Sequence, residues 1–128
     1  MRKKDWYERL VAFLSRHQST PFEWGTFDCC LFVADAIIEM TDVDIATPFR
    51  GKYKTEHGAT RALIKYGKGD VKSTFTHLLG PFKPRLNASR GDVALVPTPS
   101  GDAVGIVFNS VVWVASPDGL ITVPLREA

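Results

Sequence analysis

The hydrophobic positions change their period part-way along the chain. From residue 4 to residue 17, apolar side chains recur at helical spacing with polar residues between them. These apolar positions are Trp6, Leu10, Val11, Phe13 and Leu14. Pro21 and Gly25 interrupt the stretch that follows. The pattern predicts an amphipathic helix over 4–17, then a loop over 18–27 whose aromatic residues roof the core. Those residues are Phe22, Trp24 and Phe27. The alternative is that these aromatic residues line a groove for a sugar or a peptide.

Three more helices are expected before the pattern changes. Asp28 is a favourable N-cap, and the residues after it are apolar on nearly every side, which is typical of a helix that packs against several neighbours. This helix is expected over 28–41. Thr55 and Gly67 are the expected start and stop of the next helix, and a shorter one is expected over 70–79.

Beyond residue 90 the pattern is that of extended chain. Runs rich in β-branched residues occupy 92–97, 103–108, 110–115 and 120–124, with Pro, Gly, Asn and Asp between them. Helices followed by an antiparallel meander are typical of an α+β domain, with the helices packed on the sheet. A chain of 128 residues is the size of one domain. We therefore predict a single α+β domain over 1–128.

Composition and charge argue against two kinds of partner. The chain is 45% hydrophobic and 23% charged, which is ordinary for a folded protein. Its 16 basic and 14 acidic residues are scattered and give a net charge of +2, so no basic stripe is present to follow phosphates. No segment approaches about 18 consecutive apolar residues. We expect neither nucleic-acid binding nor a membrane span.

The cysteines and histidines do not form a disulfide framework or a metal-binding pattern. The only two cysteines are adjacent, and neighbouring residues fit disulfide geometry only with strain. This favours folding in a reducing cytoplasm. His17, His57 and His77 are far apart and lack metal-ligand spacing. We therefore expect no metal and no other cofactor.

Cys29 is the candidate nucleophile. A thiol in the first turn of a helix lies at the positive end of the helix dipole, which lowers its pKa and favours the thiolate. The alternative is that Cys29 is a thiol used only for packing or capping. Cys30 lies about 100° further round the helix and is expected to pack in the core.

Several short motifs occur in a particular order along the chain. They are Trp24-Gly25, Asp28-Cys29, Arg50-Gly51-Lys52-Tyr53, Arg90-Gly91-Asp92-Val93, Val104-Gly105-Ile106 and Asp118-Gly119-Leu120. In this order the chain resembles, over residues 5–125, the NlpC-type papain-like cell-wall hydrolases. More narrowly, it resembles the small phage and prophage tail proteins of that superfamily. The resemblance implies a papain-like fold with the cysteine as nucleophile. It also implies a histidine base directly before the Val-Gly-Ile run, and a third polar residue on the following strand.

The chain departs from the family pattern at the base. Ala103 stands where the resemblance places the histidine, and the third position falls on Ala115 or Ser116, neither of which orients an imidazole. Asp102 abuts the vacant position, but a carboxylate is a poor base for a thiol and repels the thiolate. His57, after an irregular connection, is the substitute base to be considered.

These observations lead to three functional hypotheses. The first is a bacteriophage tail-tip or tail-assembly protein that keeps the hydrolase scaffold for docking and lacks the catalytic histidine. Such a protein would be assembled in the host cytoplasm, remain in the virion, and bind hub or tail-tip subunits. The second is an active cysteine peptidase or amidase that cuts peptidoglycan stem peptides during DNA injection, with Cys29 as nucleophile. The third is an assembly factor that is missing from the finished particle.

One loop is the candidate docking surface. Val43, Ile45 and Phe49 lie in the turn-rich stretch 43–54, where we expect an exposed apolar patch. The adjoining Arg50–Tyr53 stretch is either part of that surface or a turn with a half-buried anchor.

Overall fold

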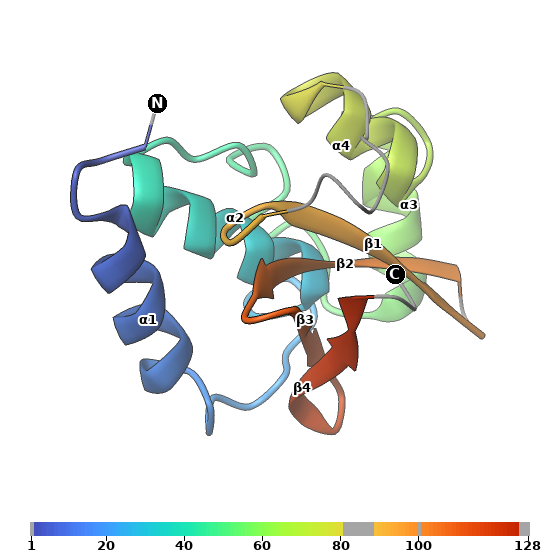
Figure 1. Ribbon diagram of the computed structural model, residues 1–128. Coiled ribbons are helices and arrows are strands. Elements are labelled where there is room, and N and C mark those ends of the chain that lie inside the picture. Colours follow the sequence, from blue (N-terminus) through green and yellow to red (C-terminus); the bar gives the residue numbers. More distant parts are fainter. Residues whose placement is uncertain (1, 81–88, 100, 126–128) are drawn as a thin grey trace.

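Helices precede strands in the chain. The computed structural model describes residues 2–80, 89–99 and 101–125. Its elements are α1 (Trp6–Arg16), α2 (Cys29–Thr41), α3 (Glu56–Tyr66), α4 (Val71–Leu79), β1 (Val93–Thr98), β2 (Gly101–Phe108), β3 (Val111–Ser116) and β4 (Gly119–Pro124). The predicted α+β class is confirmed, and each predicted helix and strand is present within one or two residues of its expected bounds (Figure 1).

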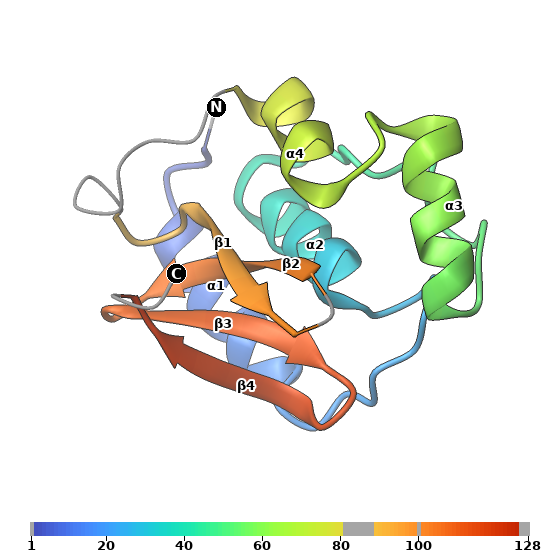
Figure 2. The ribbon, with the colours of Figure 1, turned by 90° about the vertical axis from the view of Figure 1, so that its right-hand side faces the viewer.

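The four strands form one antiparallel sheet in the order β1-β2-β3-β4. Val96 on β1 pairs with Ala103 on β2, and Trp113 on β3 pairs with Ile106 and with Thr122 on β4. Because each strand pairs with the next one along the chain, the β1–β2 and β3–β4 turns lie at the same end of the sheet. Figure 2 shows both turns at the end nearer α3.

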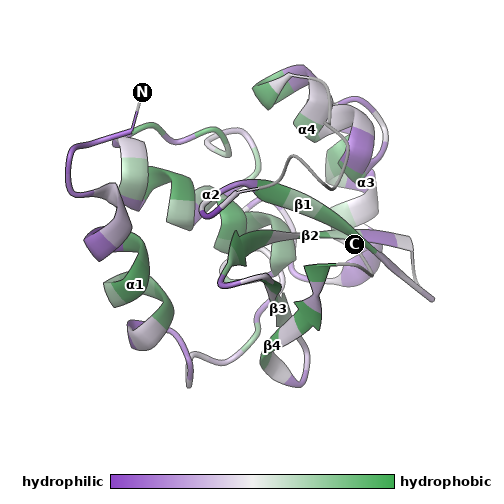
Figure 3. Cartoon of the chain, viewed as in Figure 1, coloured by the Kyte–Doolittle hydropathy of each residue, from purple (hydrophilic) through white to green (hydrophobic). Residues whose placement is uncertain are grey.

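Helix α2 is the centre of the molecule. It lies between α1 on one side and α3 with α4 on the other, and it packs against β2 and β3 (Figures 1 and 2). Hydrophobic residues follow one another along α2 and the strands, whereas the segment before α1 is hydrophilic (Figure 3). The buried residues of α2 are Leu31, Phe32, Val33, Ala34, Ala36 and Met40. The prediction of a helix buried on several sides is thereby confirmed.

Helix α1 covers α2 with one face. Leu10, Phe13 and Leu14 are buried, and the Phe13 ring lies 5.5 Å from that of Phe32, centroid to centroid. Val11, predicted to be on the apolar face, is instead 38% exposed. It lies about 100° round the helix from Leu10, which turns it away from α2.

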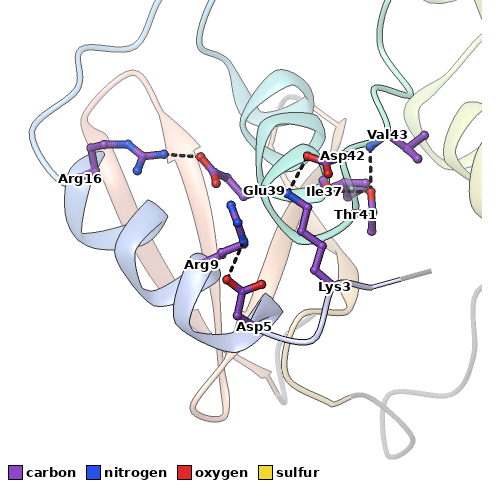
Figure 4. Close-up of polar contacts among 9 residues, drawn as sticks. All are labelled: Lys3, Asp5, Arg9, Arg16, Ile37, Glu39, Thr41, Asp42 and Val43. Atoms are coloured by element: carbon purple, nitrogen blue, oxygen red, sulfur yellow. Dashed lines mark hydrogen bonds and ion pairs between the residues drawn. The ribbon is translucent and has the colours of Figure 1, made fainter.

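Ion pairs connect the outer surfaces of α1 and α2 (Figure 4). Arg16 lies 2.5 Å from Glu39 at one end, and Lys3 lies 2.6 Å from Asp42 at the other. The Lys3 backbone N–H also donates to the Met40 carbonyl at 2.7 Å. Exposed ion pairs of this kind contribute about 0–1 kcal/mol each, so burial of the apolar faces is the main source of stability.

Gly105 allows β2 and β3 to lie close together. A Cβ atom at this position would lie 2.4 Å from the Trp113 carbonyl oxygen and 2.6 Å from the Val112 Cγ1 atom. A side chain does not fit without a shift of the neighbouring backbone. The glycine of the Val-Gly-Ile motif therefore has a packing reason. It borders a second apolar cluster, on the sheet face away from α1, made by Val96, Val107, Val112 and Val114.

Candidate functional site

Asp28 fixes the start of α2. It is 1% exposed, and its carboxylate accepts hydrogen bonds from the Leu31 N–H at 3.0 Å, the Gly25 N–H at 3.1 Å and the Tyr53 O–H at 2.5 Å. A buried carboxylate is tolerated only when donors replace its lost water. The first helical residue, Cys29, is thereby held in place relative to the loops on both sides of α2.

The Trp-Gly and Arg-Gly-x-Tyr motifs meet each other. Gly25 has a φ of +84°, and a Cβ atom there would lie 1.9 Å from the Tyr53 carbonyl oxygen. The Gly51 N–H donates to the Gly25 carbonyl at 3.1 Å. Only glycine allows this approach of two backbones. Two motifs that are 25 residues apart therefore form one packing unit beside the cysteine.

Arg50 attaches the same segment further along α2. Its guanidinium lies 2.8 Å from the Asp35 carboxylate and 2.9 Å from that of Asp44. Burial raises the pKa of Asp35 above its ordinary value, with Arg50 opposing the rise, whereas the hydrogen bond from Arg50 lowers the pKa of Asp44. Asp28 and Asp35 lie seven residues apart, about two turns, so both face the same side of α2. The Arg50–Tyr53 stretch is thus an anchor on α2.

The two thiols contact each other. The Sγ atoms of Cys29 and Cys30 are 3.9 Å apart, and both residues are half-buried. The hydrogen bond from Cys30 lowers the pKa of Cys29 below its ordinary value, while burial opposes the change. The same contact, together with burial, raises the pKa of Cys30. Cys29 is therefore the more readily ionised thiol of the two.

A groove of about 950 Å³ passes over these residues. It lies between the start of α2, helices α3 and α4, and the turn end of the sheet. Its lining residues include Phe22, Trp24, Cys29, Cys30, Phe49, Leu63, Phe75, Leu78, Val96, Ala103, Ser116 and Ile121. Cys29 is thus accessible from a space large enough for a ligand.

The positions that the resemblance assigns to the base and the third residue do share this groove with Cys29. Ala103 lines it, and both Ala103 and Cys29 pack against the second apolar cluster. Ala115 is buried, and the Ser116 hydroxyl donates to the Gly119 carbonyl at 2.8 Å. Asp102 lies on the rim. At these positions the groove therefore has the methyl group of Ala103 and the Ser116 hydroxyl, which is already hydrogen-bonded, and neither acts as a base.

All three histidines fall in the described part of the chain, and none lines the groove. His57 is exposed near the start of α3, and His77 is exposed on α4. The His17 ring stacks 5.1 Å from that of Phe27, and its Nδ1 lies 2.9 Å from the Thr20 hydroxyl. Burial lowers the pKa of His17. No imidazole is placed to accept a proton from Cys29.

The aromatic residues before α2 divide between the core and the groove. Phe27 is 5% exposed and belongs to the main core, as predicted. Phe22 packs against that core and also lines the groove. For Trp24 the groove alternative holds instead of the core, because Trp24 lines the groove and its ring meets the Phe22 ring edge-on at 4.9 Å.

The prediction that residues 43–54 form an exposed apolar patch is wrong. Ile45 packs against the core, and Phe49 lines the groove with its ring 6.1 Å from that of Tyr66. Among the three apolar residues proposed for the patch, only Val43 is exposed. The reason is the anchoring of the segment through Arg50 and Tyr53, which turns its apolar side chains towards α2 and the groove.

Sequence reasoning missed the part played by α3 and α4. Both helices were predicted, but their position as the groove wall opposite the sheet was not. That position depends on the path of the segments that connect α2, α3 and α4, and these segments have no periodic pattern. A half-buried anchor in the Arg50–Tyr53 stretch was one of the two expected alternatives, but the partner of Tyr53, the Asp28 carboxylate beside Cys29, was not predicted. A signal was present in the seven-residue spacing of Asp28 and Asp35, which places two carboxylates on one side of a helix whose other residues are mostly apolar.

Two further observations concern the described residues. They contain no group of three or more His, Cys, Asp or Glu side chains arranged to hold a metal ion. Within the same residues, no helix combines the length and the hydrophobicity needed to cross a membrane.

Comparison with known proteins places the chain in a family. Residues 1–128 match the family described as a domain of unknown function (DUF6950). The chain belongs to this family. Among the curated proteins, no match was found. The family description carries no activity with it, so the function of this DUF6950 member is inferred from the groove.

The hydrogen bond between Tyr53 and Asp28 is tested by Tyr53→Phe. Loss of the hydroxyl removes one of three donors from a buried carboxylate, so the free energy of unfolding should fall by about 1–2 kcal/mol in urea denaturation. Tyr66→Phe, at an exposed tyrosine on α3, is the matched control and should change it by less than about 0.5 kcal/mol. Equal stability of Tyr53→Phe and the unaltered protein would contradict the assignment.

The pairing of the thiols predicts a pH effect. Because the Cys30 thiol lowers the pKa of Cys29, Cys30→Ala should shift the pH profile of Cys29 alkylation by iodoacetamide to higher pH. Rates are followed by mass spectrometry of the intact protein. In Cys29→Ser the remaining thiol should react slowly, since burial still raises its pKa. If the pH profile of Cys29 alkylation is the same in Cys30→Ala as in the unaltered protein, the contact between the two thiols does not lower the pKa of Cys29.

Proposed function

We propose that this protein is a binding module on a papain-like, NlpC-type scaffold, whose groove docks a partner without cutting it. The observation that carries the proposal is that Cys29 and Ala103 line the same groove, whereas none of the three histidines lines it. The thiol is in the nucleophile position, and a methyl group stands in the position of the base.

A lowered thiol pKa does not make up for the missing imidazole. Cleavage of an amide by a thiolate needs a group that protonates the departing amine, a step that histidine performs after accepting the thiol proton. Cys29 obtains its lowered pKa from Cys30, whose own proton is held more tightly than that of an ordinary thiol. Neither cysteine both accepts the thiol proton and donates it to the departing amine.

The meeting of the motifs supports the choice of scaffold. The resemblance rests on short stretches in a given order, and two of them, Trp24-Gly25 and Arg50–Tyr53, pack on each other beside Cys29. A cysteine at the start of a central helix that faces a four-stranded antiparallel sheet agrees with the same resemblance. If the motifs occurred by chance, there would be no reason for them to contact each other, so these contacts support the resemblance.

The biological setting follows from the narrower part of the resemblance. The proposed role is that of a tail-tip or tail-assembly protein of a bacteriophage, assembled in the host cytoplasm and retained in the virion. Its partners would be hub or other tail-tip subunits, with peptidoglycan as a second candidate ligand of the groove.

The active cysteine peptidase or amidase is the second candidate function. It is favoured by the lowered pKa of Cys29 and by the access to this thiol from the groove. It requires a base from outside the groove, which in this chain would mean movement of the exposed His57 from α3 or a donation by a neighbouring protein.

The two functions are separated by incubation of the purified protein with peptidoglycan and soluble muropeptides. We expect no release of stem-peptide fragments above the level seen with Cys29→Ala, because no group in the groove relays the proton. Products are measured by liquid chromatography with mass spectrometry. Release by the unaltered protein, together with its loss in Cys29→Ala, would establish the enzyme and refute the binding module.

A gain-of-function variant is the positive control. Ala103→His places an imidazole in the groove and should increase the rate of Cys29 alkylation near pH 7, whereas the matched Ala103→Gln should not. Equal rates in the two variants would contradict the assignment of position 103 as the base position.

The setting is tested on particles of a phage that encodes the protein. Quantitative mass spectrometry of purified virions should detect the chain at a constant ratio to a known tail protein. Its presence in infected-cell lysate but not in virions would support the assembly factor and refute a structural role in the particle.

A further inference from the structure

The groove carries a charge opposite to that of the whole chain. Among the residues that the structure describes, five carboxylates and one lysine line it, although the chain has more basic than acidic residues and a net charge of +2. The carboxylates belong to Asp28, Glu56, Asp70, Asp102 and Asp118, and the lysine is Lys72. The acidic side chains are therefore concentrated at this site.

The topology places these carboxylates on two opposite rims. Asp102 and Asp118 lie at the turn end of the sheet, beside the β1–β2 and β3–β4 turns, whereas Glu56 and Asp70 lie at the starts of α3 and α4 (Figure 2). Asp28 is buried, and its oxygens already accept three hydrogen bonds. The negative charge available to a ligand is thus on the rims.

The negative charge on the sheet-side rim is offset least by other groups of the protein. Asp70 caps α4 by accepting the Ser73 N–H at 2.7 Å, and Glu56 in the first turn of α3 offsets the positive end of that helix. Asp102 and Asp118 are exposed, and neither forms an ion pair with another described residue. Within the described part of the chain, no cation offsets the charge of these two carboxylates.

Apolar side chains from both walls of the groove face its interior. Leu63 on α3, and Phe75 with Leu78 on α4, face the same space as Ile121 on β4. Leu78 is 37% exposed and Ile121 is 42% exposed, an arrangement that leaves apolar surface in contact with water. A volume of about 950 Å³ lies within the range of ligand sites.

We propose that the groove binds an extended peptide segment of a partner protein that carries Lys or Arg next to apolar residues. The cations would pair with Asp102 and Asp118, and the apolar side chains would cover Leu63 and Leu78. In an extended chain, alternate side chains point in opposite directions, which suits a site with a charged rim and apolar side chains facing its interior. This inference rests on the proposed function, in which the groove docks a partner.

The basic residues of α3 do not cancel this effect. Arg61 and Lys65 are exposed and do not line the groove, so they do not contact a ligand in it. Their repulsion acts at a distance and is screened beyond about 8 Å at physiological ionic strength.

The probe is a fluorescein-labelled extended peptide of about eight residues in which Lys and Leu alternate. Anisotropy should show saturable binding to the full chain, weakened by added salt. The matched peptide with Glu in place of Lys should bind at least about tenfold more weakly. Trp24 fluorescence should change on binding, and Trp24→Phe should remove that part of the signal, because Trp24 lies in the groove.

Two double variants locate the binding site. Asp102→Asn with Asp118→Asn should raise the dissociation constant of the Lys peptide about fivefold. Asp5→Asn with Glu8→Gln removes the same charge from exposed positions on and before α1 and should leave the constant within about twofold. Circular dichroism confirms that all variants are folded.

Each outcome has a defined meaning. Absence of binding, equal affinity for the two peptides, or equal weakening by both double variants would overturn the inference. Cleavage of muropeptides that depends on Cys29, with selective binding of the Lys peptide retained, would refute the docking function and leave the specificity of the groove in place. Selective binding without cleavage would support both.

Discussion

Three hydrogen bonds on one buried carboxylate hold the parts of the site together. Asp28 caps α2 and also accepts donors from Gly25 before the helix and Tyr53 after it. An N-cap contributes about 1 kcal/mol, and a hydrogen bond to a charged group about 1.5–3 kcal/mol. Since α2 is the helix on which α1 and the sheet pack, its first turn is held from both sides, and Cys29 shares that constraint.

The groove has one firmly held side and one that is held by few contacts. Six residues of α2 are buried, whereas α3 has a single buried residue, Ala62. A helix with so little buried apolar surface opens at a low free-energy cost compared with the core. In the proposed function such a wall would adapt to a bound segment, while Asp28, Cys29 and the strand ends would retain their positions.

The chemistry of the thiol has a structural explanation that does not require catalysis. The helix start and the neighbouring Cys30 favour the thiolate of Cys29, and both follow from the position of two cysteines after an N-cap. Hydrolysis would need a proton relay in addition. In the proposed function the same groove is used for recognition. Its rim at the turn end of the sheet carries the carboxylates of Asp102 and Asp118, close to Ala103, the position at which an enzyme would have its base.

Local patterns in the sequence determined the secondary structure, because each signal acts over a few residues. The helical spacing of apolar residues, the caps Asp28 and Thr55 and the change to extended runs at about residue 90 predicted the α+β class and the helices and strands of the described residues. That an alanine precedes the Val-Gly-Ile run, where the proposed scaffold would have its base, was also visible in the sequence, since it depends only on the order of neighbouring residues.

The tertiary structure alone decided what surrounds Cys29. Tyr53 reaches Asp28 across 25 residues of chain, and Trp24 and Phe49 face the groove because the Arg50–Tyr53 segment is anchored on α2. A loop has no periodicity to reveal which way its side chains point. Their direction is set by contacts between segments distant in sequence, and such contacts exist only once the chain has folded.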